Sequence, residues 1–155
     1  MNEALPNTGR IAAIDYGTVR IGIAVTDPDR RFASPYENYA RRDQAADAMR
    51  FKRLAKEERL VGFVVGLPVH TSGEESKKSV EARAFGEWLK SITELPVQFF
   101  DERYTSVFAE EILGQAKMTN KRRKERRDML AAQILLTAFL ESAAGSSGPP
   151  QALDG

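Results

Sequence analysis

An almost continuous apolar run is the feature that most constrains how this chain can fold. The run is Val61-Gly62-Phe63-Val64-Val65-Gly66, and Leu67-Pro68 ends it. A strand without a polar face is typical of a sheet covered on both sides, because a solvated face would alternate polar and apolar residues. The run therefore predicts a buried central strand in an α/β domain with helices against the sheet.

Four further strands are predicted around this run, bounded by turn residues. They are Ile11–Asp15, Arg20–Thr26, a segment near Arg31–Pro35, and Val97–Asp101. The first two have the composition of buried strands, and Gly17 stands in the turn between them. Asp27-Pro28-Asp29 is turn chemistry and predicts that the third strand lies at an edge. Strand, tight turn and strand at this spacing predict antiparallel neighbours.

Helical periodicity indicates three main helices. Asp43 is a candidate N-cap of a helix that runs to about Arg59, and a second helix is expected from about Glu75 to Ser91. Asp128 to Ser142 is apolar almost all round, which is typical of a helix in the interior. A short helix from Thr105 or Ser106 through Leu113 is also expected. The inner faces expected for the first two helices are Ala46, Met49 and Leu54, and then Val80, Ala84, Trp88, Leu89 and Ile92.

The order of elements predicts one α/β domain over residues 1–144, a five-stranded mixed sheet of order β-β-β-α-β-α-β-α flanked by helices. Residues 145–155 have linker composition and are expected to be a disordered tail. The chain has no cysteine, which excludes disulfides and thiolate metal sites. It also lacks an apolar run of membrane-spanning length and a leader pattern, so we expect a cytoplasmic protein.

Carboxylates stand where the predicted strands end. Asp15 closes the first strand, Asp101-Glu102 closes the fifth, and Asp128 begins the last predicted helix. In open α/β sheets, ligands bind outside the carboxyl ends of the strands. Acids gathered there would repel one another unless cations neutralise them, and Mg²⁺ or Mn²⁺ suits oxygen ligands. Taken singly, each acid has another explanation: turn chemistry for Asp15, a helix cap for Asp128, and a surface ion pair with Arg103 for the Asp101-Glu102 pair.

A basic block precedes the last predicted helix. Seven Lys and Arg residues and only one acid, Glu125, lie between Lys117 and Arg127, whereas the whole chain carries a net charge of +1. Like charges in one block repel one another, so a block of this kind indicates a loop that binds a polyanion. The alternative is a solvated basic loop without a partner.

Four motifs resemble those of the YqgF family, also called RuvX, in the family's order. They are Asp15-Tyr16-Gly17-Thr18-Val19-Arg20-Ile21-Gly22, Val65-Gly66-Leu67-Pro68 with Gly73, Asp101-Glu102-Arg103-Tyr104-Thr105-Ser106, and Lys124 with Asp128-Met129-Leu130-Ala131-Ala132. Together they span Ile11 to about Glu141. One departure is Ser72, which stands where the family often has an acid before the glycine. That departure weakens any metal-ligand role for this loop.

The resemblance implies a ribonuclease-H-like fold and a nuclease that needs Mg²⁺ or Mn²⁺. Members of the YqgF family are associated with maturation of the pre-16S rRNA, and were first proposed as Holliday junction resolvases. The candidate catalytic acids are then Asp15, Asp101, Glu102 and Asp128. Strand side chains alternate faces, so one of the adjacent acids reaches the metal, and Glu102 is preferred to Asp101 because it lies beyond the apolar run. The metal set becomes Asp15, Glu102 and Asp128.

The expected substrate contacts are Gly17, Arg20, Arg103, Thr105 and Lys124. Arg103 has two readings, a phosphate contact or an ion pair with an acid. His70, the only histidine, is a candidate general base or a solvated loop residue. The expected partner is nucleic acid, with pre-16S rRNA favoured and ribosomal particles as a further candidate. No membrane is expected, and the protein is expected to be a monomer or weak dimer.

Three alternatives to an rRNA nuclease stay open. A resolvase would cut four-way, branched DNA and would need a stable dimer, since two strands must be cut symmetrically. A protein of the actin and sugar-kinase superfamily has a phosphate loop like Asp15-Tyr16-Gly17-Thr18, but needs two such domains. A non-catalytic RNA-binding or ribosome-binding module would bind through the basic block without cutting.

Overall fold

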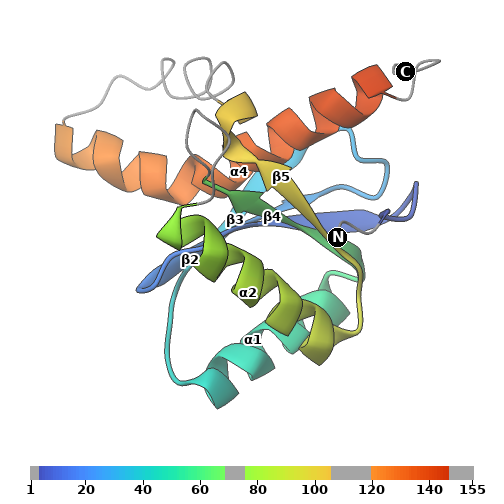
Figure 1. The fold of residues 1–155 in the computed structure, drawn as a ribbon. Coiled ribbons are helices and arrows are strands. Elements are labelled where there is room, and N and C mark those ends of the chain that lie inside the picture. The colour runs from blue at the N-terminus through green and yellow to red at the C-terminus, as the bar shows by residue number, and fades with distance from the viewer. Residues whose placement is uncertain (1–3, 69–75, 106–119, 147–155) are drawn as a thin grey trace.

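A five-stranded mixed sheet forms the centre of the molecule (Figure 1). The computed structural model describes residues 4–68, 76–105 and 120–146, and only the backbone of residues 120–129 and 144–146. The strands lie in the order β3-β2-β1-β4-β5. Their bounds are β1 Arg10–Asp15, β2 Arg20–Thr26, β3 Ala33–Ala40, β4 Leu60–Leu67 and β5 Val97–Asp101. All five predicted strands are present.

The strand pairing follows the chain order. β1 and β2 pair antiparallel, as do β2 and β3, because each pair is joined by a short turn. β4 runs parallel to β1, and β5 runs parallel to β4, because a helix crosses over between them. The carboxyl ends of β1, β4 and β5 therefore meet at one edge of the sheet. Asp15 and Asp101 end two of these three strands.

Helices cover both faces of the sheet, as the apolar run predicts. α1 (Gln44–Glu57) and α2 (Lys77–Thr93) lie on one face, and α4 (Asn120–Ser146) crosses the other (Figure 1). β4 supplies both cores: Phe63 and Val65 pack with α1 and α2, whereas Val64 packs with α4. No helix of the described residues is long and apolar enough to cross a membrane.

Capping residues set where the first two helices begin. The Asp43 carboxylate accepts a hydrogen bond from the Ala46 amide at 2.8 Å, which confirms Asp43 as the cap of α1. At α2, the Ser76 hydroxyl accepts from the Ser79 amide at 3.0 Å, so this helix begins two residues later than the expected Glu75. Ser76 also donates to the Pro68 carbonyl at 2.8 Å, which ties the start of α2 to the end of β4.

The inner faces predicted for α1 and α2 are partly wrong. Met49 is 64% exposed and Val80 is 57% exposed, and Ala84 is exposed too, whereas Phe51 and Phe85 are buried. The ring centroids of Phe51 and Phe85 lie 5.6 Å apart, so the two helices are rotated to bring these rings together. Periodicity within one helix cannot show this choice, because it depends on the neighbouring helix. Leu54 and Leu89 are buried as predicted.

Two element boundaries differ more strongly from the prediction. β3 runs to Ala40 rather than to Pro35, because its pairing with β2 continues through a register shift between Ile23 and Ala24. α4 begins at Asn120, eight residues before Asp128, so most of the basic block is helical rather than a loop. Lys, Arg and Glu are good helix formers, which outweighs their mutual repulsion here. The expected helix through Leu113 and the tail beyond Ser146 lie outside the described residues.

Candidate active site

Two carboxylates approach each other at the carboxyl edge of the sheet. Asp15 is the last residue of β1, and Glu102 is the first residue of the short 3-10 helix η1 (Glu102–Thr105) that follows β5. β4 lies between these two strands, with Gly66 beside them. A Cβ on Gly66 would lie only 2.4 Å from the Glu102 Oε2 atom. The Glu102 side chain therefore lies over Gly66 and reaches across β4.

The protonation of Glu102 reflects this position. The pKa of Glu102 is raised to about 7, mainly by burial and also by the charges of Asp15 and Asp101, while the charge of Lys78 acts in the opposite direction. A carboxyl group that is buried beside a second carboxylate resists ionisation for both reasons. Asp15 and Glu102 thus face a shared space, with the Lys78 ammonium close enough to influence it.

The alternation of strand residues places this pair on the α4 side of the sheet. Ile11 and Ala13 of β1 belong to the core beneath α4, and Asp15 follows them at the same spacing. Val64 of β4 belongs to that core too, so the open side of Gly66 faces the same way. α4 also packs against η1, the segment that carries Glu102.

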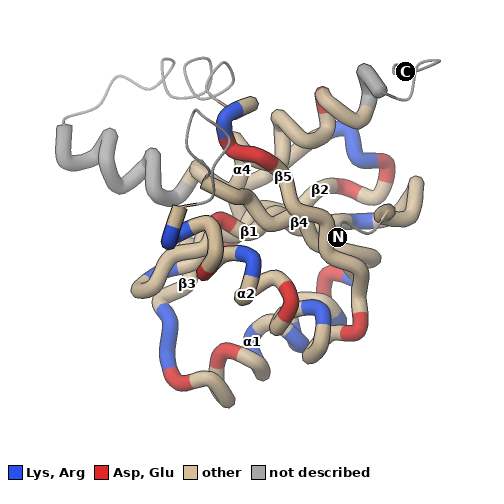
Figure 2. The backbone as a smooth tube through the Cα atoms, viewed as in Figure 1, with Lys and Arg blue, Asp and Glu red and all other residues tan. Residues whose placement is uncertain are grey.

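Asp101 lies on the opposite face and has a partner there. Val97 and Phe99, at the same spacing in β5, belong to the core beneath α2. The Arg103 Nε atom donates to the Asp101 Oδ2 atom at 2.8 Å, and the Arg103 amide donates to Oδ1 at 2.9 Å. The hydrogen bond from the Arg103 side chain is the main cause that lowers the pKa of Asp101. The structure thus brings Glu102, rather than Asp101, toward Asp15, and Arg103 forms the ion pair that was one of the two interpretations of this residue. In Figure 2 an acidic stretch followed by a basic one marks the end of β5.

Asp128 and Lys124 lie in the third and second turns of α4. The prediction that Asp128 begins the last helix is therefore wrong, and a helix-cap role is excluded by its position. The side chains of both residues lie outside the described part of the structure, as do His70 and the rest of its loop. Among the residues that are described, no three His, Cys, Asp or Glu side chains form a metal-binding group.

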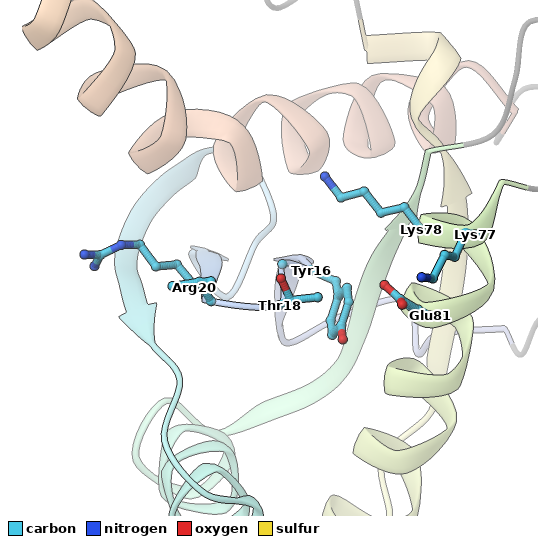
Figure 3. A pocket seen from close by; sticks show the side chains of 8 residues that line it. Tyr16, Thr18, Arg20, Lys77, Lys78 and Glu81 are labelled. Carbon is cyan, nitrogen blue, oxygen red and sulfur yellow. The ribbon is translucent and has the colours of Figure 1, made fainter.

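A cleft opens between the β1–β2 turn, which directly follows Asp15, and the start of α2 (Figure 3). Its volume is about 650 Å³. It is lined by Tyr16, Gly17, Thr18, Val19, Arg20, Lys77, Lys78 and Glu81. Two predicted substrate residues, Gly17 and Arg20, lie in it, and the Arg20 side chain points away from the lysines of α2 (Figure 3). A Cβ on Gly17 would lie 2.3 Å from the Arg20 carbonyl oxygen, so this turn requires glycine.

The sequence prediction missed the lysines of α2. Lys77 and Lys78 begin this helix, directly after the loop that follows β4. The available signal was two adjacent cations just beyond a strand end, the place where open α/β sheets bind ligands. Thr105, by contrast, was predicted to contact substrate, and its hydroxyl donates to the Glu102 carbonyl at 2.7 Å. In this structure Thr105 closes η1 and so helps to hold the Glu102 backbone.

The sequence matches a known protein family over most of its length. Residues 9–142 match the RuvX family, described as Holliday junction resolvase. The chain belongs to the RuvX family. A RuvX relative from Rhodopirellula baltica, named "Putative pre-16S rRNA nuclease", is 51% identical over 140 residues, which cover 90% of this chain and 81% of the relative. A relative of the same name from Koribacter versatilis is 39% identical over 141 residues, covering 91% and 92%.

Solved structures confirm the ribonuclease-H-like α/β fold expected of a RuvX protein. RuvC from Thermus thermophilus, in complex with a Holliday junction substrate, superposes with a TM-score of 0.57 at 15% identity, covering 89% of this chain and 97% of RuvC. The yeast mitochondrial Holliday junction resolvase Ydc2 gives a TM-score of 0.50 at 10% identity, with 89% and 80% covered. At 15% and 10% sequence identity, the similarity to these two structures shows the fold alone.

Proposed function

We propose that this RuvX protein is a cytoplasmic, metal-dependent nuclease that processes the pre-16S rRNA, with Asp15 and Glu102 as its central metal-binding acids. Membership of the family makes the chain a hydrolase of phosphodiester bonds, and the two relatives named above are both named for pre-16S rRNA. The observation that carries the proposal is the approach of Glu102 to Asp15 over Gly66. Nothing in the packing of a sheet edge requires two carboxylates on one face.

The acid pair suits a hard divalent cation. Carboxylate oxygens are the ligands that Mg²⁺ and Mn²⁺ prefer. The raised pKa of Glu102 reflects its burial and the negative charge of Asp15, and a bound cation would offset that charge. Asp128 is the proposed third acid, since its helix packs against η1. The bound ions would activate water and neutralise charge on the leaving oxygen.

The surrounding residues have separate proposed roles. Lys78, whose charge already influences Glu102, would attract the substrate phosphate to this edge of the sheet. Gly17 would let the substrate backbone approach the turn closely, because it carries no Cβ. Asp101 would hold the Arg103 guanidinium in place through their ion pair. Lys124 and the other basic residues of α4 would contact further phosphates without reading sequence.

The test is cleavage by the purified protein of a pre-16S rRNA fragment, a single-stranded RNA and a four-way DNA junction. Each is incubated with Mg²⁺, with Mn²⁺ and with chelator. We expect metal-dependent cutting of the rRNA fragment, and a loss of more than about 100-fold in Asp15→Asn, because removal of even a supporting metal contact costs 10–100-fold. Asp29→Asn, an exposed acid in the β2–β3 turn, is the matched control and should cut normally.

The assay also separates the alternatives. The description of the RuvX family favours a Holliday junction resolvase as the second candidate, and cutting of the DNA junction alone would establish it. Tight RNA binding without cutting under any metal condition would contradict the nuclease and point to a binding module. Full activity of Asp15→Asn would contradict the proposed metal site.

A further inference from the structure

A second hollow adjoins the cleft, on the other face of the sheet from the acid pair. Its volume is about 470 Å³, within the range of small-ligand pockets. It is lined by Tyr16, Arg41, Arg42, Gln44, Asp47, Glu81, Ala84, Phe85 and Trp88. Tyr16 and Glu81 line both hollows, so the two are adjacent. Tyr16 directly follows Asp15 in the chain, so a single peptide bond joins a lining residue of this second hollow to an acid of the pair.

Aromatic rings and a guanidinium form the wall of the second hollow. The ring centroids of Tyr16 and Phe85 lie 5.1 Å apart, and those of Phe85 and Trp88 lie 5.3 Å apart. The Arg41 guanidinium carbon lies 5.4 Å from the Tyr16 centroid and 5.7 Å from that of Phe85. Tyr16 and Trp88 are only half-buried, so part of each ring borders the open space.

A buried acid holds this arrangement. Asp47 is 1% exposed and accepts hydrogen bonds from the Tyr39 hydroxyl at 2.6 Å, the Arg41 Nε at 3.3 Å and the Arg42 amide at 2.9 Å. Burial, together with the hydrogen bond to Asp47, raises the pKa of Tyr39 to about 12. Arg41 is thereby fixed over the rings, while the side chain of Arg42 is exposed at the mouth of the hollow.

We infer that the second hollow receives an unpaired nucleobase of a single-stranded nucleic acid, whose adjoining phosphates run along Arg42, Lys77 and Lys78 to the acid pair. Unstacked bases are bound by stacking on aromatic rings and on guanidinium planes, and both are present here. The two hollows together are lined by five Lys and Arg residues and two acids, of which Asp47 is buried and hydrogen-bonded. Their charge therefore matches a polyanion. This inference rests on the proposed nuclease function and names how its substrate is held.

Trp88 lines this second hollow and is the only tryptophan of the chain, so its fluorescence reports on the hollow. Short single-stranded RNA and DNA of one sequence, and abasic oligonucleotides of the same length, are titrated into the full-length protein with chelator while Trp88 fluorescence is recorded. We expect saturable quenching by the base-containing strands. The abasic strands should bind about tenfold more weakly and quench little, because a factor of about ten lies within the range that stacking of one base contributes. The RNA and DNA arms show which sugar the site prefers.

Two exposed arginines give a matched pair of variants. Arg42→Ala should weaken binding of the base-containing strands several-fold, whereas Arg53→Ala, on α1 and outside both hollows, should leave it unchanged. Equal quenching by abasic strands, absence of quenching, or equal effects of the two variants would overturn the inference. Cleavage without Trp88 quenching would contradict this inference alone, and quenching without cleavage would contradict the nuclease proposal alone.

Discussion

Gly66 is the residue on which the approach of the two carboxylates depends. A methyl group there would lie 2.4 Å from the Glu102 Oε2 atom and 3.0 Å from its Cγ atom, so the carboxylate must swing away. The end of a glutamate side chain moves easily, so we expect Gly66→Ala to change the thermal unfolding temperature little. We expect its metal-dependent cleavage rate to fall about 100-fold, as displacements of about 1 Å can cause. A variant that keeps the wild-type rate would contradict the position given to Glu102.

Glu102 should also make the metal-free protein sensitive to pH. Its pKa is about 7 in the fold, against an ordinary value of 4.5 in the unfolded chain. A carboxyl group with a raised folded pKa disfavours the fold once it ionises, so its cost grows as the pH rises from about 4.5 through 7. Glu102→Gln removes that cost. With chelator, we expect the variant to gain on the order of 2 kcal/mol of unfolding free energy over wild type at pH 8, and little at pH 5.

Urea unfolding at the two pH values measures this difference. Glu57→Gln, at an exposed position near the end of α1, serves as the control and should follow wild type at both. Identical pH dependence of Glu102→Gln and wild type would show that Glu102 is not buried beside Asp15.

At the scale of elements, the contact between α2 and β5 depends on Gly86. A Cβ there would lie 2.4 Å and 2.6 Å from two ring carbons of Phe99, which belongs to the core. Alanine is favoured over glycine in a helix by about 1 kcal/mol, but overpacking a core costs about 1–3 kcal/mol. Because the Phe99 ring is rigid and buried, we expect the clash to dominate and Gly86→Ala to destabilise the fold in urea unfolding. Stabilisation by this substitution would contradict the tight packing.

Ala84→Gly calibrates that result on the same helix. Ala84 is exposed, so this change alters only helix propensity and should cost about 1 kcal/mol.

The elements themselves were largely predictable from sequence, but their mutual contacts were not. β2 and β5 have the predicted bounds, because the run of apolar residues in each sequence segment marks where the buried strand begins and ends. The predicted inner faces were wrong at Met49, Val80 and Ala84, because which side of each helix is buried depends on how the aromatic rings of α1 and α2 meet. The start of α4 was missed because a basic block was read as a loop, although its residues favour helix.

At the scale of the whole molecule, the site is assembled from three segments far apart in the sequence. Acids at the ends of β1 and β5 could be recognised from sequence. Strand alternation indicated that only one of Asp101 and Glu102 reaches the metal, and Glu102 was preferred because it lies beyond the apolar run; its metal-binding role stays a prediction. The sequence could not show that Glu102 reaches across β4, since this depends on the space that Gly66 leaves open. Nor could it reveal the aromatic hollow, whose walls come from the β1–β2 turn, α1, α2 and the segment before α1.

The central claim is that Asp15 and Glu102, and not Asp101, form the metal-binding centre of a nuclease. The most direct test is the rate of Mg²⁺-dependent cleavage of the pre-16S rRNA fragment by wild type, Asp15→Asn, Glu102→Gln and Asp101→Asn. We predict that the Asp15 and Glu102 variants each lose more than about 100-fold, as direct metal ligands should. Asp101→Asn should retain most of the activity, because its carboxylate faces away from the pair and binds Arg103. Loss of activity in Asp101→Asn with full activity in Glu102→Gln would contradict the account.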